Sequence, residues 1–201
     1  MIRPHRYNDA GQAFPIYITV VGSLLFLAFA YFAVGQAAVN RNGAQTAADA
    51  AALAAAQDRR DQLAGAWLND VLDPAKWQDI FNGDAEATGD SCRRAHQLAE
   101  RNDARVLGCN PDGLLGFTVE VETNKPVGES VIPSTADHRS SASATAVIEK
   151  RCTFDPLAEG APENVLPRLF CKDGENWDLK PGDPPANLPK PEDLFDVHLA
   201  D

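Results

Sequence analysis

The longest apolar run of the chain lies close to its N-terminus. No charged residue occurs from Ala10 to Asn40, and residues 14–34 are almost entirely apolar. At 1.5 Å per residue, a helix over these 21 positions is about 30 Å long, which matches the hydrocarbon thickness of a bilayer. The pattern therefore predicts a transmembrane helix over residues 12–40.

A secretory signal peptide is the alternative interpretation of this run. The apolar part of a signal peptide spans about 7–15 residues, and the run here is longer. Ala28-Phe29-Ala30 nevertheless has the small-x-small pattern of a cleavage site. The length favours a retained anchor, and a released soluble domain remains the alternative.

The charges beside the span predict its orientation. Arg3 and Arg6 precede it, Arg41 follows it, and the whole chain carries a formal net charge of −11. Short positive flanks stay in the cytoplasm. We therefore expect residues 1–11 to be a cytoplasmic leader and the rest of the chain to lie outside the cytoplasm, as a single-pass protein of the cell membrane.

An alanine-rich segment follows the span and extends the predicted helix. Alanine is the best helix former, so we expect one helix from about Gln12 to Leu72, with Gly35 and Gly43 as weak points. Its part over residues 41–72 would be an extracytoplasmic helix. The apolar face of that part is formed mainly by Ala47, Ala48, Ala51 and Ala55.

This alanine face has two interpretations. It can reflect helix propensity alone. It can also be a packing surface, because small side chains let a second helix approach closely. In that case we expect it to be used in assembly with partner proteins.

Residues 73–152 predict a small head of mixed structure. A helix is expected from Cys92 to Ala104, after which the apolar period changes from that of a helix to the alternation of strands. Strands are expected at 105–109, 115–123 and 140–150. The fold class is therefore α+β, with a long N-terminal helix and a small head of one helix and about three antiparallel strands.

Residues 153–201 differ in composition. Eight of the 14 prolines lie there, and 11 acidic residues face four lysines and arginines. We interpret this segment as an acidic, proline-rich extension that is flexible after about Leu179. For Leu194–Leu199, a short helix or a docking motif is considered, and disorder is favoured.

The chain contains four cysteines, Cys92, Cys109, Cys152 and Cys171, and none of them forms a C-x-x-C pair. In an exported domain, an even number of widely spaced cysteines indicates disulfides. Three connectivities exist. Sequential pairing closes the two shortest loops, so we expect Cys92–Cys109 and Cys152–Cys171.

The sequence offers little chemistry. His5, His96, His138 and His198 lack metal-binding spacing, and nucleophile-elbow, P-loop and dinucleotide patterns are missing. The acidic balance argues against nucleic acid, whose phosphates require lysine and arginine. We expect no enzymatic activity, no cofactor, no metal and no small-molecule substrate.

The N-terminal quarter resembles a known family. The residues that carry the resemblance are Gly11-Gln12 before the apolar span, then Arg41, Gln45, Ala47-Ala48-Asp49-Ala50-Ala51-Ala52-Leu53-Ala54. They resemble the TadE/TadG-like family of pilus-assembly proteins in its actinobacterial form. The resemblance implies a minor pseudopilin-like component of a Tad/Flp-type pilus or secretion apparatus. Its implied partners are other pilus-assembly proteins, beside the lipid bilayer.

Leader cleavage is a separate question. A pilin-type leader would be cut after Gly11, which would leave Gln12 as the first residue and Ile16 at the fifth position, where the family's pilins carry glutamate. Because Ile16 cannot supply that charge, we favour an uncleaved anchor. The alternative function is a membrane-tethered binding or secretion-accessory module unrelated to pili.

Overall fold

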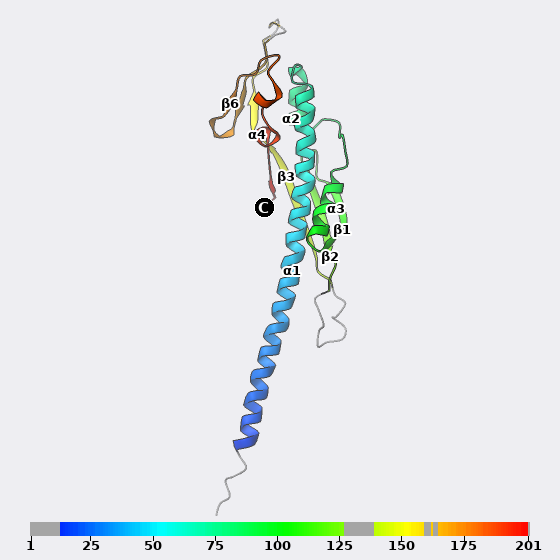
Figure 1. Cartoon of the computed structure of the whole chain (residues 1–201), viewed down its shortest axis with the longest axis vertical. Coiled ribbons are helices and arrows are strands. Elements are labelled where there is room, and N and C mark those ends of the chain that lie inside the picture. The colour runs from blue at the N-terminus through cyan, green and yellow to red at the C-terminus, as the bar shows by residue number, and fades with distance from the viewer. Residues whose placement is uncertain (1–12, 127–138, 159–161, 163–164, 201) are drawn as a thin grey trace, which may run out of the picture.

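The computed structural model describes residues 13–126, 139–158, 162 and 165–200. The fold is α+β, as predicted. A long helix, α1, runs the length of the molecule, and its second half is embedded in a small head while its first half projects below (Figure 1).

Helix α1 spans Ala13–Asn69 without a break. Its 57 residues correspond to a rod of about 85 Å. Neither Gly35 nor Gly43 interrupts it, because a single glycine costs only about 1 kcal/mol against alanine and the neighbours are strong helix formers. The helix ends three residues before the predicted Leu72, in a turn where the Asp73 amide donates to the Asp70 carbonyl.

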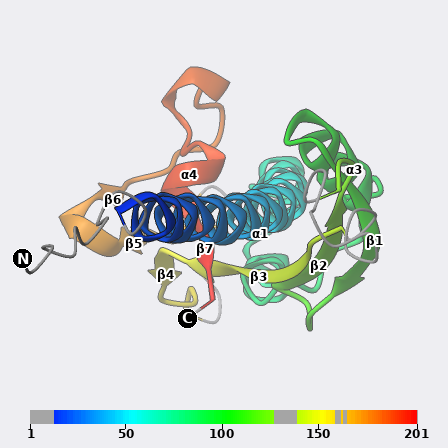
Figure 2. The ribbon, with the colours of Figure 1, turned by 90° about the horizontal axis from the view of Figure 1, so that it is seen from below.

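The head is built on a four-stranded antiparallel sheet of order β1-β2-β3-β7. The strands are β1 (Ala104–Pro111), β2 (Gly116–Thr123), β3 (Ser141–Lys150) and β7 (Phe195–Leu199). Helix α3 (Cys92–Arg101) lies beside α1. Viewed along the rod, the sheet curves around one side of α1 (Figure 2). The predicted helix and three strands of the head are therefore confirmed.

An aromatic cluster closes the end of the head farthest from the span. The short helices η1 (Pro74–Lys76) and α2 (Trp77–Phe81) follow α1. The ring centroids of Trp67 and Trp77 are 5.3 Å apart, and those of Phe81 and Phe195 are 5.4 Å apart. These contacts join the last turns of α1 to the C-terminal part of the chain.

The C-terminal segment folds back onto the head. Its elements are β4 (Cys152–Phe154), β5 (Leu169–Cys171), η3 (Lys172–Gly174), β6 (Asn176–Trp177), η4 (Pro185–Asn187), α4 (Pro191–Leu194) and β7. The expectation of disorder over Leu194–Leu199 is wrong. Leu194 and Phe195 are fully buried, and β7 pairs with β3 from Ala146 to Lys150. Burial of this face outweighs the proline-rich, acidic composition before it.

Both expected disulfides are present. Cys92–Cys109 ties the start of α3 to β1, and Cys152–Cys171 ties β4 to β5. The first fixes the helix against its neighbouring edge strand. The second closes the loop that carries the C-terminal segment away from the sheet and back.

Candidate functional site: the span surface of α1

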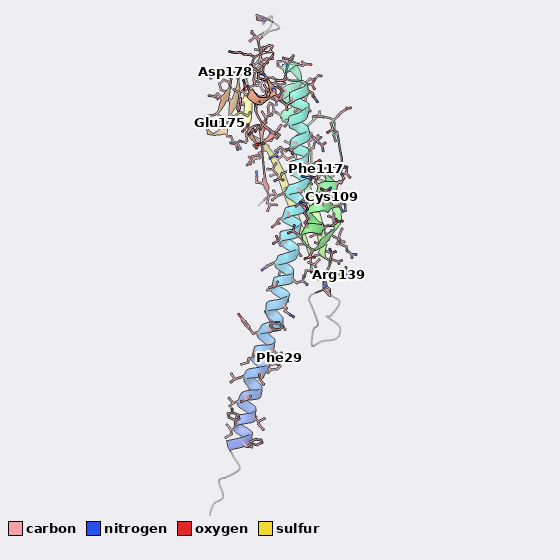
Figure 3. The ribbon with its side chains drawn as sticks, viewed as in Figure 1. Phe29, Cys109, Phe117, Arg139, Glu175 and Asp178 are labelled. Atoms are coloured by element: carbon pink, nitrogen blue, oxygen red, sulfur yellow. A yellow bond between two sulfur atoms is a disulfide. The ribbon has the colours of Figure 1, made fainter. Side chains whose placement is uncertain are left out.

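The first half of α1 is uncovered. We call its exposed apolar side chains between Phe14 and Val39 the span surface. Phe29 stands out from the helix with 66% of its surface exposed (Figure 3). The other large members, all at least 37% exposed, are Phe14, Ile16, Tyr17, Ile18, Val20, Val21, Leu24, Leu25, Phe26, Leu27, Tyr31, Phe32, Val34 and Val39. Among the described helices, only α1 is long and apolar enough to cross a membrane.

The polar side chains within the span are satisfied by the helix itself. Thr19 Oγ1 lies 2.9 Å from the Pro15 carbonyl oxygen and 2.8 Å from that of Ile16, and Ser23 Oγ donates to the Thr19 carbonyl at 2.7 Å. A hydroxyl that bonds its own helix needs no water. These groups are therefore compatible with a lipid environment.

The alanine face of the second half is covered by the chain's own head. Ala47, Ala48, Ala51 and Ala55 are each 0% exposed, and this half of α1 packs on β2, β3 and α3. The prediction that these alanines receive a helix of a partner is therefore wrong. Small side chains do serve close packing, but what they meet is largely a sheet, in which β3 is itself rich in alanine.

One arginine anchors the long connection between α2 and α3. Arg59 Nη2 donates to the Gly83 carbonyl at 2.9 Å and to the Ala85 carbonyl at 2.7 Å. Partial burial lowers the pKa of Arg59 from its ordinary value. The two carbonyls compensate for part of the water that this guanidinium loses. Arg59 therefore has a structural role.

A neighbouring polar cluster holds the same connection. Ser91 Oγ lies 3.0 Å from Asp58 Oδ2, and Gln62 Nε2 donates to that oxygen at 2.7 Å. The Thr88 amide donates to Gln62 Oε1 at 3.0 Å. Each polar group of this cluster faces a partner of the same chain, so the cluster fixes the loop before α3.

An open groove lies where the span surface meets the head. We call it the collar groove. Its α1 wall includes Tyr31, Phe32 and Val39, and its head wall includes Asp103, Thr123 and Lys125. The head residues flank the start of β1 and the end of β2. Sequence reasoning missed this site because its walls are far apart along the chain, and only antiparallel pairing of β1 with β2 brings the head residues together.

Several predicted residues lie outside the described part of the chain. These are the possible-cleavage residues Gly11 and Gln12, the leader arginines Arg3 and Arg6, and the histidines His5 and His138. Leader cleavage and orientation therefore stay predictions. Among the described residues, no group of three or more His, Cys, Asp or Glu side chains is placed to hold a metal ion.

The comparison with family models found one similarity, and it falls on the first part of the chain. Residues 11–58 match the family described as putative Flp pilus-assembly TadE/G-like. The predicted TadE/TadG-like resemblance is confirmed. The matched segment includes all residues of the span surface and of the alanine face. It ends within α1, so the residues after α1 lie outside the match.

The match supports a protein related to pilus assembly. No curated protein and no solved structure matches the chain. The first part of the matched segment is an uncovered apolar stretch of α1, and its second part is covered by the head.

Proposed function

We propose that this protein is a membrane-anchored structural component, minor pseudopilin-like, of a Tad/Flp-type pilus assembly or secretion apparatus. The observation that carries the proposal is the span surface. It is uncovered by any described part of the chain, it continues without a break into the head, and it lies in the segment that matches the family. The proposed role is structural and not catalytic.

The physical case for a membrane anchor is the size of the uncovered apolar surface. Soluble monomers rarely expose contiguous apolar patches beyond a few hundred Å², and the span surface, from Phe14 to Val39, surrounds about seven turns of α1. Arg3 and Arg6 favour a cytoplasmic N-terminus. Two disulfides favour an oxidising compartment for the head.

The buried alanine face limits where partners can bind. Because the head already covers Ala47, Ala51 and Ala55, other pilus-assembly proteins must contact either the span surface within the membrane or the outer surface of the head. We favour the span surface, because a helix in a bilayer can pack against other helices without first losing contact with its own head.

Site-specific photocrosslinking in cells that produce the apparatus tests this proposal. A crosslinker at Phe29 should yield adducts with other assembly proteins, and deletion of the chain should reduce surface pili. A crosslinker at Gln57, which is exposed on the covered half of α1, serves as the matched control. Reporter fusions after Asp61 and Asp201 should behave as exported proteins. Normal piliation without the chain, and no protein adduct at Phe29, would reject the proposal.

A tethered binding module is the second candidate. It is favoured by apolar side chains at the distal end of the head, where Leu72 is 64% exposed and Leu157 36%. A groove lined partly by Pro74, Phe154 and Leu157 lies there as well. Crosslinks that form from Leu157 and not from Phe29 would select this function.

A further inference from the structure

We propose that the collar groove binds one anionic phospholipid, with its phosphate at Lys125 and its acyl chains along Tyr31 and Phe32. This inference rests on the proposed membrane anchoring of α1. It assigns a ligand to a place where two separate parts of the chain meet, and it implies that the head sits directly on the membrane surface.

The height of the groove along α1 places it at the membrane boundary. Residues 14–34 fill the hydrocarbon thickness, and Val39 lies five residues, or about 7.5 Å, beyond Val34. The headgroup layer on each side of a bilayer is about 5–8 Å thick. The groove extends from Tyr31 to Val39 and beyond, so it crosses from the hydrocarbon into the headgroup layer.

The two ends of the groove differ in chemistry in the way that a phospholipid does. On the span side, Tyr31 is 84% exposed and Phe32 63% exposed. Tyrosine is enriched at this depth, where its ring contacts acyl chains and its hydroxyl reaches the interface. On the head side, the Lys125 side chain is 79% exposed, and its Nζ lies 3.5 Å from Asp103 Oδ2. An ion pair that is this exposed is weak, so the ammonium group of Lys125 can still bind a phosphate.

The charge around the groove favours an anionic lipid. Four elements of the head, α3, β1, β2 and β3, each have one end on the side of the span. We call the charged residues within two positions of these ends, together with Arg41, the proximal rim. Its members are Arg41, Glu100, Arg101, Asp103, Arg105, Glu122, Lys125 and Arg139. Among the residues that the structure describes, five cations of this rim thus face three carboxylates; the connection over 127–138, with Glu129 and Asp137, lies outside the described residues and is not counted. Figure 3 shows Arg139 at this end of the head.

Pairing among the described residues of the rim leaves positive charge in excess. Arg105 and Arg139 share one carboxylate, that of Glu122. A phosphate beside Lys125 would lie next to this excess. By contrast, residues 153–201 contain 11 acidic residues and four lysines and arginines.

Native mass spectrometry of the full chain, released from nanodiscs that contain equal amounts of phosphatidylglycerol and phosphatidylcholine, tests the proposal. The parent chain should retain one phosphatidylglycerol in preference to phosphatidylcholine. Lys125→Gln should lower the ratio of lipid-bound to lipid-free chain about fivefold, the effect expected of one lysine near an anionic surface. Lys172→Gln makes the same charge change at the distal end and should retain lipid like the parent.

A second variant tests the apolar wall. Val39→Trp should fill the groove and reduce retention of both lipids, whereas Leu24→Trp, deep in the span, should not. Equal retention by Lys125→Gln and the parent, or equal retention of the two lipids, overturns the lipid site. A lipid-free dimer would overturn it in favour of a second copy in the groove. A chain that enters nanodiscs but retains no lipid refutes this inference alone, and a chain that fails to enter them refutes the membrane anchor as well.

Discussion

The two halves of α1 belong to one helix and are both apolar, but they meet different surroundings. From Phe14 to Val39 the side chains are uncovered, and most of them are large and apolar. From Ala44 to Ala56 they are mostly alanine, and most are buried against the sheet and α3. Hydropathy alone would assign both halves to a nonpolar environment.

The difference shows that side-chain volume indicates what an apolar helix face meets. Bulky residues suit a fluid environment such as lipid, which adapts to any shape. Alanine suits a fixed neighbour, because protein interiors are close-packed and a small residue lets two backbones approach. The alanines of α1 are therefore a sign of packing within the molecule, and the bulky residues are a sign of surface left for others.

The largest expected effect on stability comes from truncating a side chain that covers the second half of α1, compared with one that is exposed on the first half. Phe195 is fully buried beside the second half of α1, and Phe29 is exposed in the first. We expect Phe195→Ala to lower the free energy of unfolding of the head by about 3–5 kcal/mol. Phe29→Ala should change it by less than about 0.5 kcal/mol. Urea unfolding in detergent, followed by tryptophan fluorescence, measures both. Equal effects would mean that β7 does not close the head.

An added charge should impair membrane insertion when it lies in the first half of α1 and not when it lies in the second. Leu25→Arg replaces an exposed side chain of the span and should disfavour membrane insertion by about 3 kcal/mol. Gln57→Arg, at an exposed position of the covered half, should insert normally. The measurement is the fraction of each variant that resists carbonate extraction. Normal extraction resistance of Leu25→Arg would argue against a span through residue 25.

Added bulk should also act on one half only. Ala51 has no exposed surface, so Ala51→Leu should overpack the contact between α1 and the sheet and destabilise the head by about 1–3 kcal/mol. Leucine is nearly as good a helix former as alanine, so helix propensity contributes little. Ala30→Leu in the exposed span is the control and should be neutral. A stable Ala51→Leu head would show that the helix can move away from the sheet without cost.

The smallest effect concerns pH. Lys172 Nζ donates to Glu149 Oε2 at 3.0 Å and thereby lowers the pKa of Glu149 below its ordinary value of 4.5. The stability from this contact is fully present above pH 4.5 and is lost as the pH falls through the lowered pKa. His198 and Asp196 of β7 also face this carboxylate.

Lys172→Gln should therefore remove a small stabilisation at pH 7 and none at pH 2, where Glu149 is protonated in both chains. Urea midpoints at the two pH values measure the difference. Membrane insertion should not share this dependence, because the span contains no acidic or basic residue. A larger effect of the substitution at pH 2 than at pH 7 would contradict the assigned cause.

Local patterns were sufficient for much of the fold. The continuous helix follows from alanine and a long apolar run, and β2 follows from the strict alternation of Phe117, Val119 and Val121. The disulfides follow from loop length. Each of these features depends on residues that are near one another in the sequence.

The features that escaped prediction depend on residues far apart. The covering of Ala47 and Ala51 depends on how the sheet curves, which no helical pattern encodes. β7 is only five residues long, and the proline-rich, acidic stretch before it dominated the composition. The collar groove joins the middle of α1 to the end of β2, so its partners become neighbours only after folding.

The strand that completes the cover of α1 is the last one to be synthesised. Helix α1 leaves the ribosome first, yet β7, which completes its cover, follows only after the whole head has been made. A nascent chain therefore cannot complete its head early, because β7 has not yet been made. The head can close only after Phe195 and its neighbours have been made, so the last strand in the sequence completes the fold.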